Sequence, residues 1–244
     1  MFQEIQRTLY IVATPIGNLS DITVRALETL KAADAILCED TRVTSKLLAR
    51  YEIHKPLVAC HEHTDERKLS QIIGRLREGE KLAFVTDAGT PGLSDPGNKL
   101  VALAIAAGIA VVPIPGVSAL AAIVSVAGID MREFLFLGFP PHKKGRQTFF
   151  KTVAASEMPV IYYESPHRVM KNLAMLVEYA PAGLAARFAE SRRESRREMR
   201  VVIGRELTKM FEEIIHGTIG EAREYFAAHP EKVKGEFVII AYKN

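Results

Sequence analysis

The chain has 244 residues, enough for one large domain or two small ones. Its apolar share of 48%, charged share of 25% and formal net charge of +3 suit a soluble globular protein and do not by themselves indicate a nucleic-acid partner. No apolar run is long enough to span a bilayer, the N-terminus has no signal-peptide core, and two cysteines make no disulfide framework, so we expect a cytoplasmic protein without a membrane association.

Strand-like and helix-like segments alternate through the first half of the chain. Short apolar runs predict buried strands, and apolar residues at positions i, i+3, i+4 and i+7 predict amphipathic helices. The predicted strands cover residues 8–13, 35–38, 56–59, 81–85 and 110–114. The predicted helices begin near Asp21, at Val43, near Leu69, at Asn98 and after Ser118. This alternation is typical of a parallel sheet covered by helices.

The second half has a different rhythm. It contains predicted strands at residues 134–138, 160–163 and 236–241, and a predicted helix from Pro166. We therefore predict an α/β protein of two domains, residues 1–117 and 118–244.

Three loops rich in glycine or proline follow predicted strands of the first half. They cover residues 14–18, 86–97 and 115–118. In an open parallel sheet such loops gather at the carboxyl edge, where ligands bind, so we expect a ligand site there. The alternative is that glycine and proline only form turns.

The loop TDAGTPGLSDPG, residues 86–97, carries Asp87 and Asp95 but no lysine or arginine. Two carboxylates would repel a pyrophosphate, and the chain contains neither a P-loop nor a G-x-G-x-x-G motif. A nucleoside-containing cation such as S-adenosylmethionine fits this loop better. The alternative is that Asp95 caps the next helix, with Pro96 in its first turn, and that Asp87 shapes a turn.

Motifs along nearly the whole chain resemble those of the tetrapyrrole methylase superfamily. Within it, the combination of CEDTR and HEH resembles the group that methylates a cytidine 2′-hydroxyl of small-subunit (16S) ribosomal RNA. The matching stretches are residues 9–48, HEHTDE (61–66), TDAGTPGLSDPG, PIPGVSALAA (113–122), FLGFPP (136–141), YESPHR (163–168), RELTK (205–209) and KGEFVII (234–240).

The resemblance implies two α/β domains, S-adenosyl-L-methionine bound in the cleft between them, and a homodimer that acts on the 16S RNA of the small ribosomal subunit. Two other functions stay open: a tetrapyrrole methylase of the same fold, and a non-catalytic nucleotide-binding module. The cofactor-binding residues that the resemblance implies are Pro15, Gly17, Asp87, Gly89, Ser94, Asp95, Pro96, Ser118, Ala119, Phe139, Tyr163, Leu207 and Gly235.

A ribose oxygen that attacks a methyl group must lose its proton, so a general base is expected. The candidates follow the second and third predicted strands: Glu39, Asp40, His61 and Glu62. We favour Glu62 or Asp40. Arg42 has two possible roles, holding a neighbouring phosphate or forming an ion pair with one of these acids.

Cys60, His61 and His63 raise the possibility of a metal site. If these residues continue a strand, alternation places Cys60 on the face opposite both histidines. A structural zinc site needs four converging ligands, and no second cluster is evident. We therefore expect no metal.

Two basic segments are candidates for contact with RNA. Lys143, Lys144 and Arg146 follow the FPP motif and suit RNA phosphates, with a solvated loop as the alternative. Residues 190–200, ESRRESRREMR, have acid–arginine spacing that is typical of an exposed, salt-bridged helix. They depart from the resemblance and could also be an RNA-facing extension or a neutral insertion.

Overall fold

The computed structural model describes residues 7–180 and 198–243. The chain divides into two compact units, Met1–Ser118 and Ala119–Asn244, each with its own sheet. Most of the Arg-rich segment, residues 190–197, lies outside the described residues, so its predicted helix stays a prediction. Among the described residues, no helix is long and apolar enough to cross a membrane.

The first unit contains a five-stranded sheet in which every pairing is parallel, in the order β3-β2-β4-β1-β5. The central strands are fully buried, which explains their continuous apolar sequences. Each predicted strand is present, and no strand end differs from the prediction by more than one residue. The strands are β1 (Thr8–Val12), β2 (Ala35–Cys38), β3 (Leu57–Ala59), β4 (Leu82–Val85) and β5 (Ala110–Ile114).

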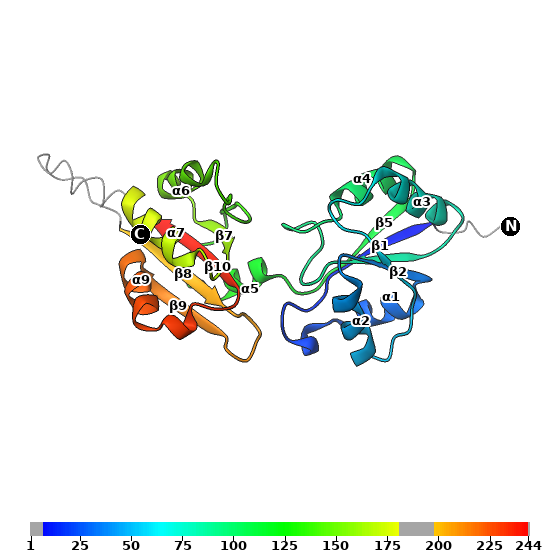
Figure 1. The fold of residues 1–244 in the computed structure, drawn as a ribbon, viewed down its shortest axis with the longest axis horizontal. Helices are drawn as coiled ribbons and strands as arrows, with labels where there is room; N and C mark the ends of the chain where they lie inside the picture. Colours follow the sequence, from blue (N-terminus) through cyan, green and yellow to red (C-terminus); the bar gives the residue numbers. More distant parts are fainter. Residues whose placement is uncertain (1–6, 181–197, 244) are drawn as a thin grey trace, which may run out of the picture. The chain divides into compact units, whose positions relative to one another are not determined.

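Helices cover both faces of this sheet (Figure 1). Leu30 of α1 and Leu48 of α2 pack with Ile36 on one face, whereas the apolar stripe of α3 packs with Phe84 on the other. The predicted helix at Val43 begins two residues earlier, because Asp40 caps it. The helical elements of this unit are η1 (Leu19–Asp21), α1 (Val24–Ala32), α2 (Thr41–Arg50), α3 (Glu66–Arg77) and α4 (Asn98–Ala106).

The second unit contains a mixed sheet in the order β6-β7-β10-β8-β9. Only β6 and β7 pair in parallel, and the other pairings are antiparallel. Its core surrounds Phe150, Tyr162 and Phe226, which are fully buried. The elements are α5 (Ala119–Ser125), β6 (Leu135–Phe136), α6 (Arg146–Ala155), β7 (Val160–Glu164), α7 (Val169–Tyr179), β8 (Met199–Arg205), β9 (Glu213–Thr218), α9 (Ile219–Ala228), η2 (Pro230–Lys232) and β10 (Phe237–Lys243).

Candidate functional site

The three loops that follow β1, β4 and β5 contact one another, as the sequence predicted. Thr14 and Gly89 exchange two backbone hydrogen bonds, of 2.9 and 3.0 Å between nitrogen and oxygen. The Thr90 hydroxyl donates to the carbonyl oxygen of Val117 at 3.1 Å. Gly89 has a φ of +79°, a left-handed conformation that favours glycine. These contacts bring the predicted cofactor loops of the first unit together into one structure, the loop triad.

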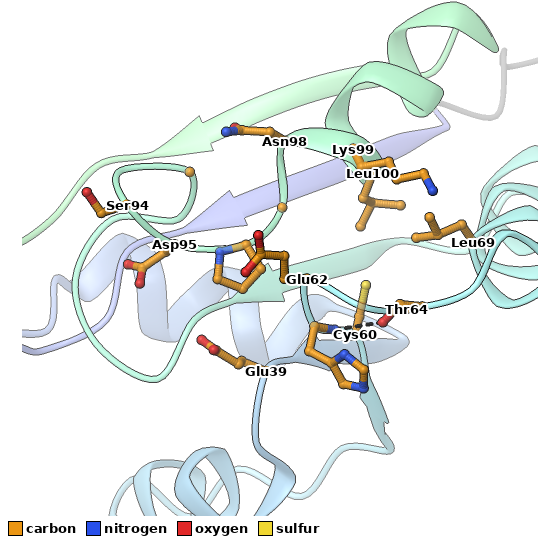
Figure 2. A pocket seen from close by; sticks show the side chains of 14 residues that line it. Glu39, Cys60, Glu62, Thr64, Leu69, Ser94, Asp95, Asn98, Lys99 and Leu100 are labelled. Atoms are coloured by element: carbon orange, nitrogen blue, oxygen red, sulfur yellow. Dashed lines mark hydrogen bonds between the residues drawn. The ribbon is translucent and has the colours of Figure 1, made fainter. Parts of the chain in front are cut away.

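A cavity of about 540 Å³ lies beside the loop triad, at the carboxyl ends of β2, β3 and β4. Figure 2 shows the carboxyl groups of Glu39, Glu62 and Asp95, which come from three different loops around this cavity. None of the three forms an ion pair with a described residue. The cavity is lined by Glu39, Cys60, His61, Glu62, Thr64, Leu69, Gly92, Ser94, Asp95, Pro96, Gly97, Asn98, Lys99 and Leu100.

Burial and neighbouring carboxylates raise the pKa values of two carboxyl groups in this cavity. Burial, followed by the negative charges of Glu39 and Asp87, raises the pKa of Asp95 to about 6. Burial and the charge of Asp87 also raise the pKa of Glu39. A cation bound in the cavity would offset this repulsion, so the residues present fit a positively charged ligand.

Asp95 does not cap the helix that follows it, so that alternative is wrong. The N-cap of α4 is Gly97, with a φ of +126° and no side-chain capping bond. Pro96 therefore precedes the cap instead of occupying the first turn. The Asp95 carboxyl group lines the cavity, which leaves it available for a ligand.

Cys60 to His63 do not continue strand β3, so the alternation argument about them does not hold. The backbone turns here, with the Thr64 amide donating to the His61 carbonyl at 3.0 Å. The Thr64 hydroxyl accepts from the His61 amide at 2.8 Å and closes the turn. Cys60 is buried, whereas His61, Glu62 and His63 are exposed. In the described part of the chain, no group of three His, Cys, Asp or Glu side chains is arranged to hold a metal.

Asp40 and Arg42 bind each other. The Asp40 carboxylate caps α2 by accepting from the Arg42 amide at 2.8 Å, and it pairs with the Arg42 guanidinium at 2.6 Å. The hydrogen bonds from Arg42 lower the pKa of Asp40 to about 2. The Asp40 amide donates to Asp87 at 3.1 Å, which ties the start of α2 to the loop after β4. Asp40 and Arg42 do not line the cavity that holds Glu39 and Glu62.

The other predicted cofactor residues of the first unit lie in the loop triad. Pro15 is buried and Gly17 is exposed in the loop after β1. The hydroxyl oxygen of Ser118 is buried and has no hydrogen-bond partner among the described residues. An unpaired buried hydroxyl is costly, so this atom is suited to a ligand.

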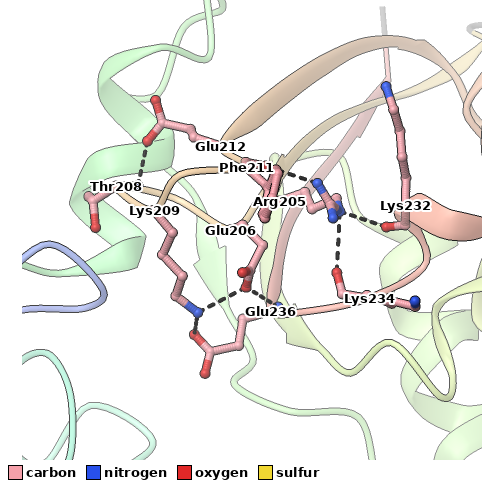
Figure 3. A network of polar contacts seen from close by, with 9 residues as sticks. All are labelled: Arg205, Glu206, Thr208, Lys209, Phe211, Glu212, Lys232, Lys234 and Glu236. Atoms are coloured by element: carbon pink, nitrogen blue, oxygen red, sulfur yellow. Dashed lines mark hydrogen bonds and ion pairs between the residues drawn. The ribbon is translucent and has the colours of Figure 1, made fainter.

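Two predicted cofactor residues of the second unit, Leu207 and Gly235, are sequence neighbours of residues in a polar network around the β8–β9 turn. Figure 3 shows this network, which includes Glu206 and Glu236. Lys209 contacts both Glu206 at 2.9 Å and Glu236 at 3.0 Å. Glu206 has a φ of +50°, and a Cβ atom at Gly235 would meet its carboxyl group at 2.2 Å. This turn also borders a second cavity, of about 650 Å³, which Gly235 lines.

Phe139 and Tyr163, two further predicted cofactor residues of the second unit, form an aromatic pair. The centroids of their rings lie 5.2 Å apart, and Phe139 is 53% exposed.

The buried guanidinium of Arg205 donates to the carbonyl oxygens of Phe211, Lys232 and Lys234 and anchors the neighbouring loops.

The predicted RNA-binding cations lie in the loop between β6 and α6. Lys143 and Lys144 are exposed, and Arg146 is the first residue of α6. None of the three forms an ion pair with a described residue. The loop is nevertheless held at its base, because the Arg168 guanidinium donates to the Pro140 carbonyl oxygen at 3.0 Å.

Residues 8–223 match the family model described as tetrapyrrole (corrin/porphyrin) methylases. This chain belongs to the tetrapyrrole methylase family.

Relatives place it in one branch of the tetrapyrrole methylase family. Proteins named ribosomal RNA small subunit methyltransferase I are 43% identical in Neisseria meningitidis serogroup B, over 96% of this chain and 76% of that protein, and 42% identical in Escherichia coli O157:H7, over 96% and 77%. The protein of that name from Borrelia garinii subsp. bavariensis is 44% identical over 97% of this chain and 99% of its own length. The chain belongs to this branch.

Solved structures of tetrapyrrole methylases confirm the predicted fold. A cobalt precorrin-4 methyltransferase of cobalamin biosynthesis has a TM-score of 0.68 at 18% identity, over 99% of this chain and 97% of its own. A uroporphyrin-III C-methyltransferase from Thermus thermophilus has a TM-score of 0.60 at 18% identity, over 96% and 93%.

Sequence reasoning missed several residues of the cavity, among them Thr64, Asn98 and Lys99. Thr64 had one usable signal, its place three residues after His61, which is typical of a side chain that closes a turn. Asn98 and Lys99 had no such signal. They are the first residues of a helix, and the sequence does not show that this helix start lines a cavity until the positions of the neighbouring loops are known.

Proposed function

We propose that this chain is an S-adenosylmethionine-dependent methyltransferase that modifies the ribose 2′-oxygen of a cytidine in 16S ribosomal RNA of the small subunit. The observation that carries the proposal is the 42–44% identity, over nearly all of this chain, to proteins named for methylation of that RNA. An acidic cavity beside three contacting loops at a sheet's carboxyl edge supports it.

We further propose that two different parts of the first unit bind the cofactor and the target. The loop triad, with Pro15, Gly17, Gly89 and Ser118, holds the cofactor with its positively charged sulfur toward the acidic cavity. The cavity receives the uncharged ribose of the target nucleotide, and the RNA phosphates lie outside it. Residues 94–96 border both and line up the reacting atoms. When bound, S-adenosylmethionine supplies a methyl group activated by a positively charged sulfur. The negative charge of Asp87 and Asp95 favours such a cation.

Glu62 is the residue that we propose as the general base. It is exposed within the cavity and has no described ion-pair partner. Asp40, the other favoured candidate, is bound by Arg42 with a pKa of about 2, which makes it a weak proton acceptor. With the cofactor bound, Glu62 would take the proton of the ribose hydroxyl and pass it to water, while S-adenosylmethionine would supply the methyl group and leave without it.

The remaining assignments follow from this arrangement. His61 lies beside Glu62 and contacts the substrate by hydrogen bonding. Lys143, Lys144 and Arg146 bind RNA phosphates. Ala119, Phe139, Tyr163, Leu207 and Gly235 complete the proposed cofactor contacts, and we propose that the working form is a cytoplasmic homodimer.

The function is tested by mapping ribose methyl groups in 16S RNA from cells with and without this gene. Loss of one cytidine 2′-O-methyl group supports the proposal, and an unchanged map refutes it. The purified protein should restore the missing methyl group to small subunits from the deleted strain.

Glu62→Gln tests the proposed base. It should lower kcat by about 10²–10⁴-fold, as removal of a general base typically does, with little change in cofactor affinity. Asp40→Asn serves as the comparison and should lower kcat less, because Asp40 is already engaged by Arg42. A Glu62→Gln enzyme with unchanged kcat would assign the proton to another acceptor.

A further inference from the structure

Helix α2 presents a row of cations to solvent. Arg42, Lys46 and Arg50 recur at intervals of four residues, so they lie along one side of the helix, and all three are exposed. The opposite side of α2 carries Thr44 and Leu48, which are buried against the sheet. We call Arg42, Lys46 and Arg50 the α2 stripe. Its length is about 12 Å, from the rise of about 1.5 Å per residue.

The protein itself does little to neutralise this stripe. The sequence of α2, TRVTSKLLAR, contains no acidic residue. Lys46 and Arg50 form no ion pair with any residue in the described ranges, and only Arg42 has a carboxylate partner, Asp40. Like charges four residues apart repel on a helix, so the arrangement does not help α2 to fold.

The position of the stripe relates it to the proposed active site. Helix α2 begins directly after Glu39, which lines the acidic cavity, and Asp40, which is its N-cap. The stripe therefore starts at the edge of the sheet where the cavity opens and runs away from it. Between the cations lie Ser45 and Ala49, whose short side chains allow an extended chain to approach the helix.

We propose that the α2 stripe binds the sugar–phosphate backbone of the substrate RNA next to the nucleotide in the cavity. The inference rests on the proposed function, and it adds an RNA contact surface on the first unit. A row of exposed cations, of which Lys46 and Arg50 form no ion pair with a described residue, suits a polyanion, because each contact with a phosphate releases a condensed counterion. Arg42 exchanges Asp40 for a phosphate or retains both, since its guanidinium has five N–H donors.

The test compares two double variants of the full chain that remove the same charge. Lys46→Gln with Arg50→Gln removes the free cations of the stripe. Arg77→Gln with Lys81→Gln is the matched control. Both residues are exposed and lie just before β4, near the amino ends of the parallel strands, whereas the stripe begins near their carboxyl ends. Binding to small-subunit RNA is measured between 50 and 200 mM salt, together with cofactor affinity and thermal unfolding.

The stripe variant should show a salt dependence, d log K/d log[salt], that is shallower by about 1.4, or about 0.7 for each lost phosphate contact on a single strand. Between the two salt concentrations it should therefore lose roughly sevenfold less affinity than the parent protein. Its KM for RNA should rise while cofactor affinity stays constant. The charge-preserving exchange of Lys46→Arg with Arg50→Lys should retain the parent slope, as should the control variant.

A stripe variant that keeps the parent slope while the parent methylates RNA would overturn this inference and leave the proposed function intact. Weaker binding to assembled subunits with an unchanged slope on naked RNA would assign the stripe to a protein partner and also contradict it. If the parent protein neither binds nor methylates the RNA, the proposed function itself fails and the inference fails with it.

Discussion

Burial, together with the charges of Glu39 and Asp87, raises the pKa of Asp95, and this has a consequence for stability. A carboxyl group whose folded-state pKa, about 6, exceeds its ordinary value binds more protons in the folded state between these two pH values. Stability is therefore highest when Asp95 is protonated in both states; it falls as pH rises from about 4 to about 6 and levels off above that.

Asp95→Asn should remove this penalty. We expect the free energy of unfolding of the variant to exceed that of the parent by about 1 kcal/mol at pH 7.5, after allowance for solvent screening. Below about pH 4 the two proteins should have the same free energy of unfolding. Chemical denaturation across this pH range measures the difference. Asp130→Asn is the control, since Asp130 is exposed and paired with Arg132, which lowers its pKa to about 2, and it should show no gain at any pH. Equal responses of the two variants would contradict the assignment.

Gly97 combines two requirements for glycine. Its φ is +126°, and a Cβ atom would lie 2.6 Å from the ring of Phe84, which is fully buried. Gly97→Ala should lower the free energy of unfolding by about 2–4 kcal/mol, from backbone strain and overpacking together. Gly108→Ala, at a φ of +70° with open space around it, has the strain alone and should cost about 1 kcal/mol. Equal costs, measured by urea unfolding, would mean that Phe84 moves aside freely.

The loop between β6 and α6 depends on Arg168 of the YESPHR motif. Its Nε donates to the Ser165 hydroxyl at 3.1 Å and lies 3.5 Å from the buried Glu164, while its Nη1 donates to Pro140. Lysine has one ammonium group and cannot reproduce this fork of donors.

Arg168→Lys should therefore release the base of the basic loop. Amides of residues 142–145 should exchange with deuterium faster, while amides of β7 remain protected. RNA affinity should fall, and cofactor affinity should not. Arg132→Lys, an exposed arginine with an exposed partner, is the comparison and should change neither. Unchanged exchange in the loop would show that Phe139 and Tyr163 hold it without Arg168.

The elements of the first unit could be predicted from the sequence because its buried parallel strands are short, continuous apolar runs separated by amphipathic helices. Strand β9 gave no comparable signal, since its sequence EIIHGT is half-buried at a sheet edge and contains a charge and a glycine. The turn at His61 was also missed, because alternation along a strand cannot reveal where the strand ends.

At the scale of the whole molecule, the candidate site shows where local pattern stops being informative. The three contacting loops were predictable because carboxyl ends of parallel strands share one edge. The mutual effect of Glu39 and Asp95 was not, because it depends on β2 and β4 being neighbours, a strand order that the sequence pattern does not contain. The electrostatic interaction between Glu39 and Asp95, which are far apart in the sequence, is evident only once the strand order is known.

The fold is shared with enzymes that methylate tetrapyrroles, so it cannot decide the substrate. We expect the purified protein to transfer methyl groups to small ribosomal subunits that lack the modification and not to uroporphyrinogen III. The reason is chemical: the described cavity is lined by Glu39, Glu62 and Asp95, and these acids would repel the carboxylate-rich rim of a tetrapyrrole. Radiolabelled methyl transfer, with a uroporphyrin-III C-methyltransferase as the positive control for the second substrate, measures both reactions. Methyl transfer to uroporphyrinogen III and none to the subunits would indicate a tetrapyrrole substrate and remove RNA from the proposed function.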